Sequence, residues 1–306
     1  MWAVILIFLG SLLLTGFGTP FVRQMAMAIG FVDAPSKRKL HVAPMPLMGG
    51  VAIFGGAIVL LAVYFGRLGN TRVLGQLFGA ALISAIGLLD DKRPLSAKVK
   101  FAVQAAAFIL VIWLGTSVRI PGFPLWLNWV LTFIWFSIIT NAINFLDNMD
   151  GLCAGVAAVA AAFIVLMANF SGQFFVGPLA AAILGACLGF LRYNFKPARI
   201  FMGDAGSLLL GYMLASMSLQ LRFPDNSTFV TWMVPLFILG VPLFDLTLVS
   251  IARLKRGVNP LTAAGKDHTS HRLVRMGLSQ REAVLTIYLL GGIYGMIALF
   301  IIQADL

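Results

Sequence analysis

Two adjacent aspartates mark the first polar segment whose residues could do chemistry. Asp90 and Asp91 follow the end of a long apolar run, and Lys92 and Arg93 come directly after them. Carboxylates at the edge of an apolar helix are costly near lipid unless they bind a cation, a proton or a basic partner. The pair therefore indicates a polar site, while a solvated loop neutralised by Lys92 and Arg93 remains the alternative.

A second acidic segment, residues 141–151, carries amides and carboxylates with no lysine or arginine among them. Its polar residues are Asn141, Asn144, Asp147, Asn148 and Asp150. Oxygen ligands of this kind suit Mg²⁺, which usually takes one or two carboxylates together with substrate phosphates and water. Capping of the following helix by Asn148 or Asp150 is the alternative, and it accounts for one of the five residues.

A third segment, residues 192–207, places Asp204 between Gly203 and Gly206. Glycine permits tight turns and a close approach of the backbone to a ligand. The next apolar run begins at once, so the N-terminus of its helix could face an anion. Phe201 stands beside this polar loop, where it could stack on a base or simply pack at the interface.

The fourth segment reads Asp267-His268-Thr269-Ser270-His271-Arg272. Two histidines three residues apart share a helix face. A zinc site would need a third soft ligand nearby, so phosphate binding by histidine and arginine fits better. The third histidine, His41, follows Arg38-Lys39-Leu40, a basic cluster that could hold anionic lipid headgroups or help to bind a nucleotide or lipid phosphate.

The elements that must position these residues are membrane-spanning helices. The chain has 306 residues, of which 60% are hydrophobic and 11% charged, whereas soluble domains carry about 25% charged residues. About 20 apolar residues cross a bilayer as a helix, and lipid excludes open sheets. We therefore predict an all-α polytopic membrane protein, a single integral-membrane domain over residues 1–306, with about ten spans near 2–20, 48–66, 73–89, 101–118, 124–143, 152–169, 174–191, 206–221, 228–250 and 284–303.

The charges orient these spans. Of the 22 basic residues, 18 fall in alternate loops or at their edges, and the intervening loops hold only Arg67, Arg72, Arg119 and Arg222. Lysine and arginine are enriched on the cytoplasmic side, so both termini are predicted to be extracytoplasmic. Nine of the 11 acidic residues gather at the same cytoplasmic ends, the exceptions being Asp225 and Asp305. Opposite charges converging on one interface indicate a polar site there, and the net charge of +11 indicates positive cytoplasmic loops rather than nucleic-acid binding.

Taken together, the four segments match the needs of a metal-dependent phosphoryl transfer between a soluble nucleotide substrate and a lipid phosphate. An ion-coupled transporter is the rival from another class, but transport acids tend to lie near the bilayer midplane, where these spans are almost free of ionisable groups. A non-catalytic lipid-binding scaffold is a further alternative. Cys153 and Cys187 lie in apolar stretches and predict neither a disulfide framework nor a metal site.

Five segments, in order along the chain, resemble the polyprenyl-phosphate N-acetylhexosamine-1-phosphate transferase family, which includes the phospho-MurNAc-pentapeptide transferases. They are RKLHVAPMPLMGG (38–50), LLDDKR (88–93), NAINFLDNMDGL (141–152), NFKPARIFMGDAGSL (194–208) and DHTSHRL (267–273). The resemblance implies a ten-helix fold with a cytoplasmic Mg²⁺ site, at which Mn²⁺ could substitute. It implies transfer of a sugar-1-phosphate from a UDP-sugar to undecaprenyl phosphate, with release of UMP.

The resemblance also implies roles for individual residues. The catalytic residues would be Asp90, Asp91, His268, His271 and Arg272, with the aspartate pair handling the lipid phosphate. The metal would be held by Asp204 and Asn144, with Asp147 bordering the site. The substrate-binding residues would be His41, Asn141, Asp150, Asn194 and Phe201, with Phe201 stacking on uracil.

The last segment departs from the family's pattern, because Ser270 and Arg272 flank His271 where many members have three clustered histidines. This departure argues against the pentapeptide-transferase branch and favours UDP-N-acetylglucosamine as the donor. The expected partners are thus a UDP-N-acetylhexosamine and undecaprenyl phosphate, in the inner (plasma) membrane of a bacterium. The sequence is compatible with a homodimer but does not set the oligomeric state.

Overall fold

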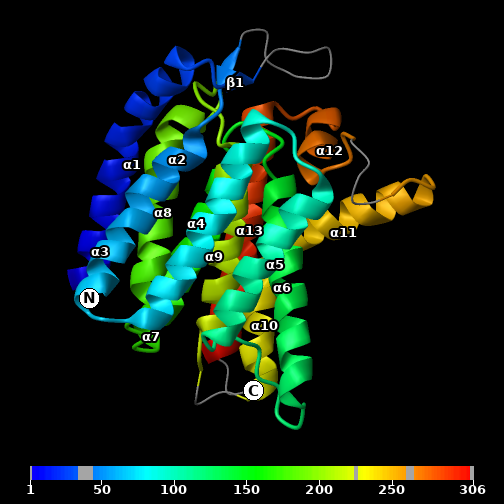
Figure 1. Ribbon diagram of the computed structural model, residues 1–306. Coiled ribbons are helices and arrows are strands. Elements are labelled where there is room, and N and C mark those ends of the chain that lie inside the picture. Colours follow the sequence, from blue (N-terminus) through cyan, green and yellow to red (C-terminus); the bar gives the residue numbers. More distant parts are fainter. Residues whose placement is uncertain (1, 34–43, 224–226, 260–264, 304–306) are drawn as a thin grey trace.

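The computed structural model describes residues 2–33, 44–223, 227–259 and 265–303, and it confirms an all-helical membrane protein (Figure 1). Each of the ten predicted spans overlaps one or more helices. The helices are α1 (Trp2–Ala28), α2 (Gly49–Phe54), the π-helical η1 (Gly55–Val59), α3 (Leu60–Arg67), α4 (Thr71–Lys92), α5 (Ala97–Trp113), α6 (Leu125–Phe145), α7 (Leu152–Phe170), α8 (Val176–Asn194), α9 (Gly203–Gln220), α10 (Thr228–Ile238), α11 (Gly240–Lys255), α12 (Thr269–Arg275) and α13 (Gln280–Gln303). Two short strands, β1 (Val32–Asp33) and β2 (Met45–Pro46), pair antiparallel.

Within the described residues, seven helical runs are long and apolar enough to cross a bilayer. The number becomes eight if the bent pair α10–α11 is one span. The runs are α1, α2 through α3, α4, α6, α7, α8 and α13. Helices α5 and α9 have 17 and 18 residues, close to the lower limit for a span. The multi-pass architecture is therefore confirmed, and the number of ten spans stays a prediction.

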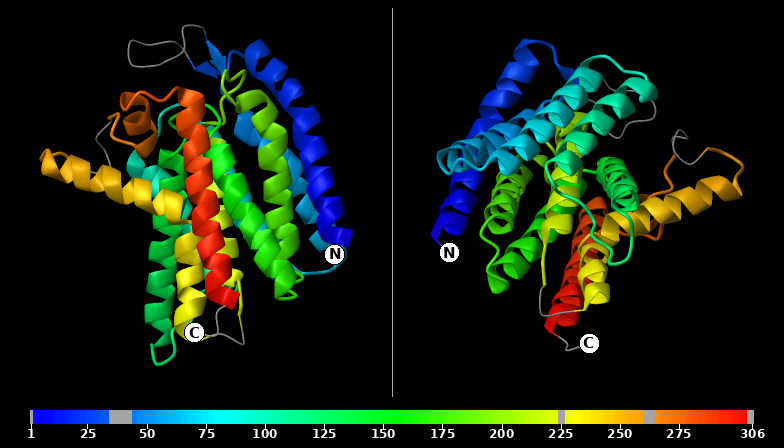
Figure 2. Two further views of the ribbon diagram at one scale, coloured as in Figure 1. Left: turned by 180° about the vertical axis from the view of Figure 1, so that it is seen from behind. Right: turned by 60° about the horizontal axis from the view of Figure 1, so that its bottom comes forward.

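The prediction of one continuous span over residues 228–250 is wrong. The helix breaks after Ile238, and its two halves, α10 and α11, are bent by 69°. Pro242 follows the break, and a proline in a continuous helix would lack its N–H bond and clash with the carbonyl four residues earlier, here that of Ile238. As a result α11 leaves the bundle sideways (Figures 1 and 2). The helix predicted for 101–118 is displaced toward the N-terminus, because α5 begins at Ala97 and ends at Trp113.

Helix α9 forms the centre of the molecule. Nearly every side chain from Gly203 to Ser218 is buried, and α9 packs against α2, α4, α6, α7, α8 and α10. Small residues let membrane helices approach closely. At Gly87 of α4 an added Cβ would lie 2.5 Å from the backbone of Asp204 and Ala205. This contact brings the end of α4, with its two aspartates, against the start of α9.

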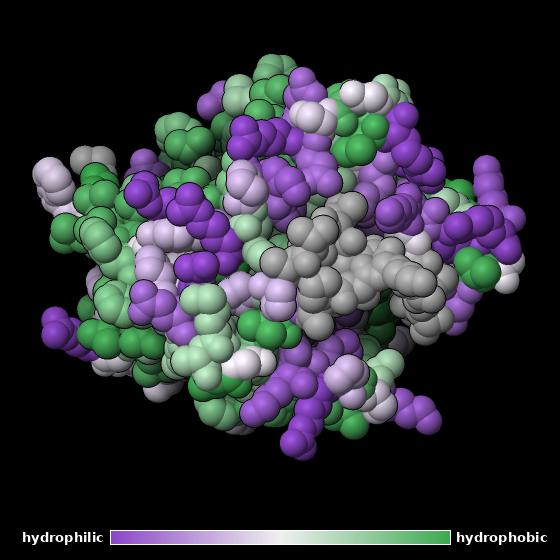
Figure 3. All heavy atoms as spheres, turned by 90° about the horizontal axis from the view of Figure 1, so that it is seen from above, coloured by the Kyte–Doolittle hydropathy of each residue, from purple (hydrophilic) through white to green (hydrophobic). Residues whose placement is uncertain are grey.

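The polar segments meet at one end of the bundle. The α4–α5 connection, α12 and the start of α9 lie at the upper end in Figure 1, and both chain ends lie at the lower end. Seen from above, hydrophilic residues gather on this upper face (Figure 3). The predicted grouping of acids at one end is therefore present, and the side of the membrane that this end faces stays a prediction.

Candidate active site

Lys100, near the start of α5, joins two of the predicted site aspartates. Its Nζ lies 2.9 Å from Asp90 Oδ2 and 3.4 Å from Asp204 Oδ2. The second oxygen of Asp90 accepts the backbone N–H of Leu95 at 2.7 Å, which folds the connection between α4 and α5 around the carboxylate. Segments far apart in sequence are thus held together by one cation shared between two carboxylates.

Asp91 points at the N-terminus of α9 rather than at Lys100. Its Oδ1 accepts the N–H of Asp204 at 2.8 Å, and its Oδ2 accepts the N–H of Ala205 at 3.2 Å. The first N–H groups of a helix lack partners within the helix, and a carboxylate there is also favoured by the helix dipole. The anion that we expected at this helix start is therefore supplied by the chain itself, and the two adjacent aspartates have different surroundings.

The turn before α9 requires glycine at position 203. Gly203 has a φ of +72°, a region that other residues seldom occupy, and an added Cβ there would collide with the Asp91 carboxylate. The flanking glycine inferred from the sequence thus serves both the turn and the close approach of Asp91.

Asn144, at the end of α6, holds Asp204 from the other side. Its Nδ2 donates to Asp204 Oδ1 at 2.9 Å and to Ser207 Oγ at 2.8 Å. Asp147 follows in the loop after α6 and is half-buried. Burial raises the pKa of the Asp147 carboxyl to about 7, and the negative charge of Asp204 adds to the shift.

These residues fit a divalent cation bound with the help of a substrate. Among the described residues, no three His, Cys, Asp or Glu side chains form a ready metal cage. Mg²⁺ does not require one, because it is usually held by one or two carboxylates plus substrate phosphates. The Asp204 carboxylate and the side-chain carbonyl of Asn144 supply oxygen atoms that could bind the ion. Asp147 repels Asp204 and Asp91, so added positive charge would be stabilised here.

The residues predicted to bind the nucleotide form a neighbouring network between two loops. Asn194 is buried, and its amide accepts the N–H of Gly151 and donates to the carbonyl of Ile200, both at 3.0 Å. Asp150 Oδ2 accepts the N–H of Ala198 at 3.0 Å and lies 3.3 Å from Lys196 Nζ. In the described residues these groups join the loop after α6 to the loop before α9.

Two further residues predicted to bind substrate lie in the same region. Phe201 is half-buried in the loop before α9, and its backbone forms hydrogen bonds with Pro46 of β2 and with Gly49, the first residue of α2. Asn141 donates within α6 to the Ser137 carbonyl at 2.8 Å and to Gln104 at 3.3 Å. His41 falls outside the described residues.

The histidine segment lies against the loop that follows α6. His268 is the N-cap residue of α12 rather than a residue on its face, and its ring centroid is 6.2 Å from that of His271. Ser270 Oγ donates to Asn148 Oδ1 at 2.6 Å, next to Asp147. Burial lowers the pKa of half-buried His271, and Arg272 Nε donates to the Asp267 carbonyl at 2.9 Å.

The structure brings to this region two residues that are outside the predicted site. The sequence indicates Lys100 only as part of the positive charge of its loop, because the connection between α4 and α5 separates it from Asp90. Asp245 is buried on α11 and contacts His268 at 2.7 Å. As an acidic residue within an apolar run, Asp245 is predicted from the sequence to be a structural acid near the inner interface, and the sequence does not predict its contact with His268.

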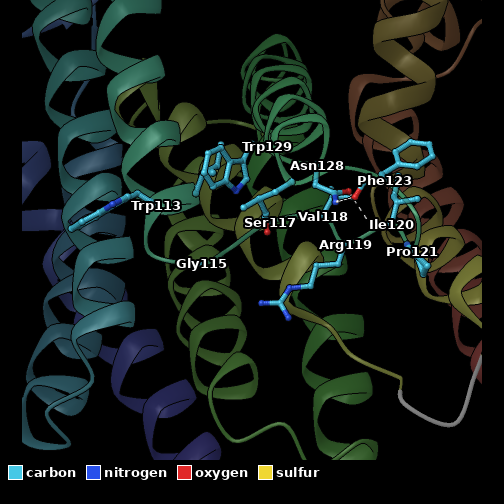
Figure 4. Close-up of a pocket in the computed structure, with 12 residues that line it drawn as sticks. Trp113, Gly115, Ser117, Val118, Arg119, Ile120, Pro121, Phe123, Asn128 and Trp129 are labelled. Carbon is cyan, nitrogen blue, oxygen red and sulfur yellow. Dashed lines mark hydrogen bonds between the residues drawn. The ribbon is translucent and has the colours of Figure 1, made fainter.

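A pocket of about 520 Å³ lies at the opposite end of the bundle, between the end of α5 and the start of α6 (Figure 4). It is lined by Trp113, Ser117, Arg119 and Trp129 among others. None of the predicted site residues lines this pocket, so it is separate from the acidic cluster.

Comparison with known proteins identifies the family of this chain. Residues 73–222 match the model of glycosyl transferase family 4, a range that contains nearly all of α4 and the whole of α5 through α9. The chain is 40% identical to a probable undecaprenyl-phosphate N-acetylglucosaminyl 1-phosphate transferase of Bacillus subtilis, over 100% of this chain and 87% of the relative.

Two further relatives carry similar names. A decaprenyl-phosphate N-acetylglucosaminephosphotransferase of Mycolicibacterium smegmatis is 34% identical over 94% of this chain and 79% of its own length. An undecaprenyl-phosphate alpha-N-acetylglucosaminyl 1-phosphate transferase of Escherichia coli is 27% identical over 88% of this chain and 76% of its own length. The chain therefore belongs to glycosyl transferase family 4, the family of polyprenyl-phosphate N-acetylhexosamine-1-phosphate transferases that its motifs resemble.

Proposed function

We propose that this protein transfers N-acetylglucosamine-1-phosphate from UDP-N-acetylglucosamine to undecaprenyl phosphate, in a Mg²⁺-dependent reaction in the bacterial plasma membrane that releases UMP. The observation that carries the proposal is the junction of Asp90, Lys100, Asp204 and Asn144 at one end of the bundle. The names of the relatives, which specify N-acetylglucosamine and a polyprenyl phosphate, support this choice over the pentapeptide-transferase alternative.

The reaction joins two anionic substrates, so the chain's main task is to neutralise and position them. Asp204 and Asn144 would hold Mg²⁺, which when bound neutralises the diphosphate of the nucleotide. Lys100 contributes the positive charge nearest to Asp90 and Asp204. Phe201 lies on the same loop as Asp204 and would take the uracil ring.

Asp90 would position and deprotonate the lipid phosphate, whose oxygen attacks the β-phosphorus of the UDP-sugar. The new oxygen–phosphorus bond joins the lipid phosphate to the sugar phosphate, while the bond between the β-phosphorus and the bridging oxygen breaks and UMP departs. A covalent aspartyl intermediate is the rival route. Asp91 holds the start of α9, so its part in the reaction would be to position Asp204.

The test is an assay of the purified protein with undecaprenyl phosphate and a panel of UDP-sugars. UMP should be released with UDP-N-acetylglucosamine, and EDTA should abolish the release until Mg²⁺ is restored. Release that is unaffected by EDTA would contradict the metal assignment. Release with UDP-MurNAc-pentapeptide alone would establish the alternative branch, and no release with any sugar would contradict the proposed reaction.

A further inference from the structure

Asp245 is a buried carboxylate whose two oxygens are both directed at the start of α12. It is 1% exposed. Its Oδ2 lies 2.7 Å from His268 Nδ1, and its Oδ1 accepts the backbone N–H of Thr269 at 2.7 Å. A buried carboxylate is costly unless it is paired and hydrogen-bonded, and within the described residues Asp245 forms a salt bridge with His268 alone.

This contact determines which nitrogen of His268 carries the proton. An ionised carboxylate only accepts hydrogen bonds, so Nδ1 of the ring must donate. The hydrogen bond of one ring nitrogen sets the protonation of the other, and Nε2 becomes the atom left for a ligand. Phe145 and His271 pack edge-on against the ring, with centroids at 6.5 and 6.2 Å, and these contacts restrict its rotation.

A role in anchoring α12 does not by itself explain why position 245 carries a carboxylate. Ser270 already ties α12 to Asn148 at 2.6 Å. Asp267, the residue before His268, forms a salt bridge with Arg256 and lies 3.7 Å from Arg253. An uncharged hydrogen-bond acceptor at position 245 could still accept the N–H of Thr269, although more weakly, whereas a charged one also stabilises a positive charge on His268.

We propose that Asp245 is a positioning residue that holds the Nδ1–H of His268, so that Nε2 is the ring nitrogen directed to the substrate phosphates, and that its carboxylate stabilises the imidazolium that forms when Nε2 takes a proton and donates to a phosphate oxygen. Donors that carry a charge bind phosphate oxygens about twice as strongly as neutral ones. This inference rests on the proposed transferase activity and adds a role for a residue outside the five family-like segments.

The test compares Asp245→Asn with the unaltered protein by two readouts. Asparagine keeps an oxygen for the Thr269 N–H, but its amide donates to Nδ1 and shifts the His268 proton to Nε2. The chain has three histidines, so ¹⁵N-histidine NMR of the detergent-solubilised protein can report each ring, with His268→Gln assigning the signal. The kcat of Asp245→Asn should fall about 10- to 100-fold, with a smaller change in KM for the UDP-sugar.

Two controls separate positioning from anchoring. Ser270→Ala removes the other tether of α12 and should leave the His268 tautomer unchanged. In an His268→Ala background, Asp245→Asn should cause no further loss of kcat, because the carboxylate acts through the histidine. An unchanged His268 tautomer in Asp245→Asn, or an equal loss of kcat with and without His268, would overturn the proposal.

The spectroscopic readout needs no substrate, so it also separates this proposal from the proposed function. If the unaltered protein released no UMP, the transferase proposal would fail, while the tautomer of His268 would still decide whether Asp245 controls the ring.

Discussion

At the scale of single residues, Asp90 and Asp91 are neighbours in sequence with different functions in the structure. Asp90 pairs with Lys100, and Asp91 binds backbone N–H groups of α9. Adjacent residues near the end of a helix point about 100° apart, so they reach different partners. The sequence predicts that both carboxylates need partners. Which partner each one has is determined by the packing of α4 against α5 and α9.

Replacing Lys100 by methionine should lower the rate of UMP release about 10²- to 10³-fold, the cost typical of losing one charge-stabilising group. The loss follows because Asp90 and Asp204 keep their negative charges without the cation between them. The matched control is Lys98→Met, since Lys98 is exposed on the same helix and should retain activity. A Lys100→Met enzyme with at least half of the normal rate would contradict this assignment.

At the scale of elements, three other helices contact the start of α9, where Asp204 lies. Helix α6 reaches it through Asn144, α4 through Asp91 and α5 through Lys100. The helix is surrounded on all sides and has little freedom to shift. Residues that hold its first turn should therefore affect both stability and activity.

Gly203→Ala should destabilise the protein more than Gly69→Ala. Both glycines have a positive φ, 72° and 64°, so alanine strains the backbone by about 1 kcal/mol at either position. At Gly203 the added methyl group also displaces Asp91, while Gly69 has nothing within 4 Å of the added atom. Thermal unfolding in detergent measures the difference, and UMP release should fall only in Gly203→Ala. Equal unfolding temperatures for the two variants would show that the contact with Asp91 is unimportant.

At the scale of the whole molecule, the chain places its chemistry at one end of an apolar bundle. Both termini lie at the other end (Figure 1), and so does the Trp113 pocket, which is formed by the end of α5 and the start of α6. The excess of basic residues near the acidic cluster predicts that this end faces the cytoplasm. A soluble nucleotide and a membrane-bound lipid phosphate could both reach a site at such a boundary.

Cysteine labelling tests this orientation. Cys153 and Cys187 are free and buried, so they should give little background with a membrane-impermeant maleimide. Arg67→Cys, at the end of α3, should react in intact cells, and Lys98→Cys, at the start of α5, only after permeabilisation. Labelling of Lys98→Cys in intact cells would reverse the predicted topology.

The sequence by itself determined the membrane class, the helical segments, the family and most of the acidic cluster. Long apolar runs can only be helices in lipid, and unpaired acids at their ends indicate a site because such groups are costly near lipid. These inferences depend on local composition and spacing. They need no knowledge of which helices are neighbours.

Only the tertiary structure showed which side chains contact one another. The pairing of Lys100 with Asp204, the break of the 228–250 segment and the contact between Asp245 and His268 depend on which helices pack together. Close packing of helix faces, and not sequence separation, sets such contacts. An acidic residue within an apolar run therefore indicates that it has a partner, and only the fold shows which residue that partner is.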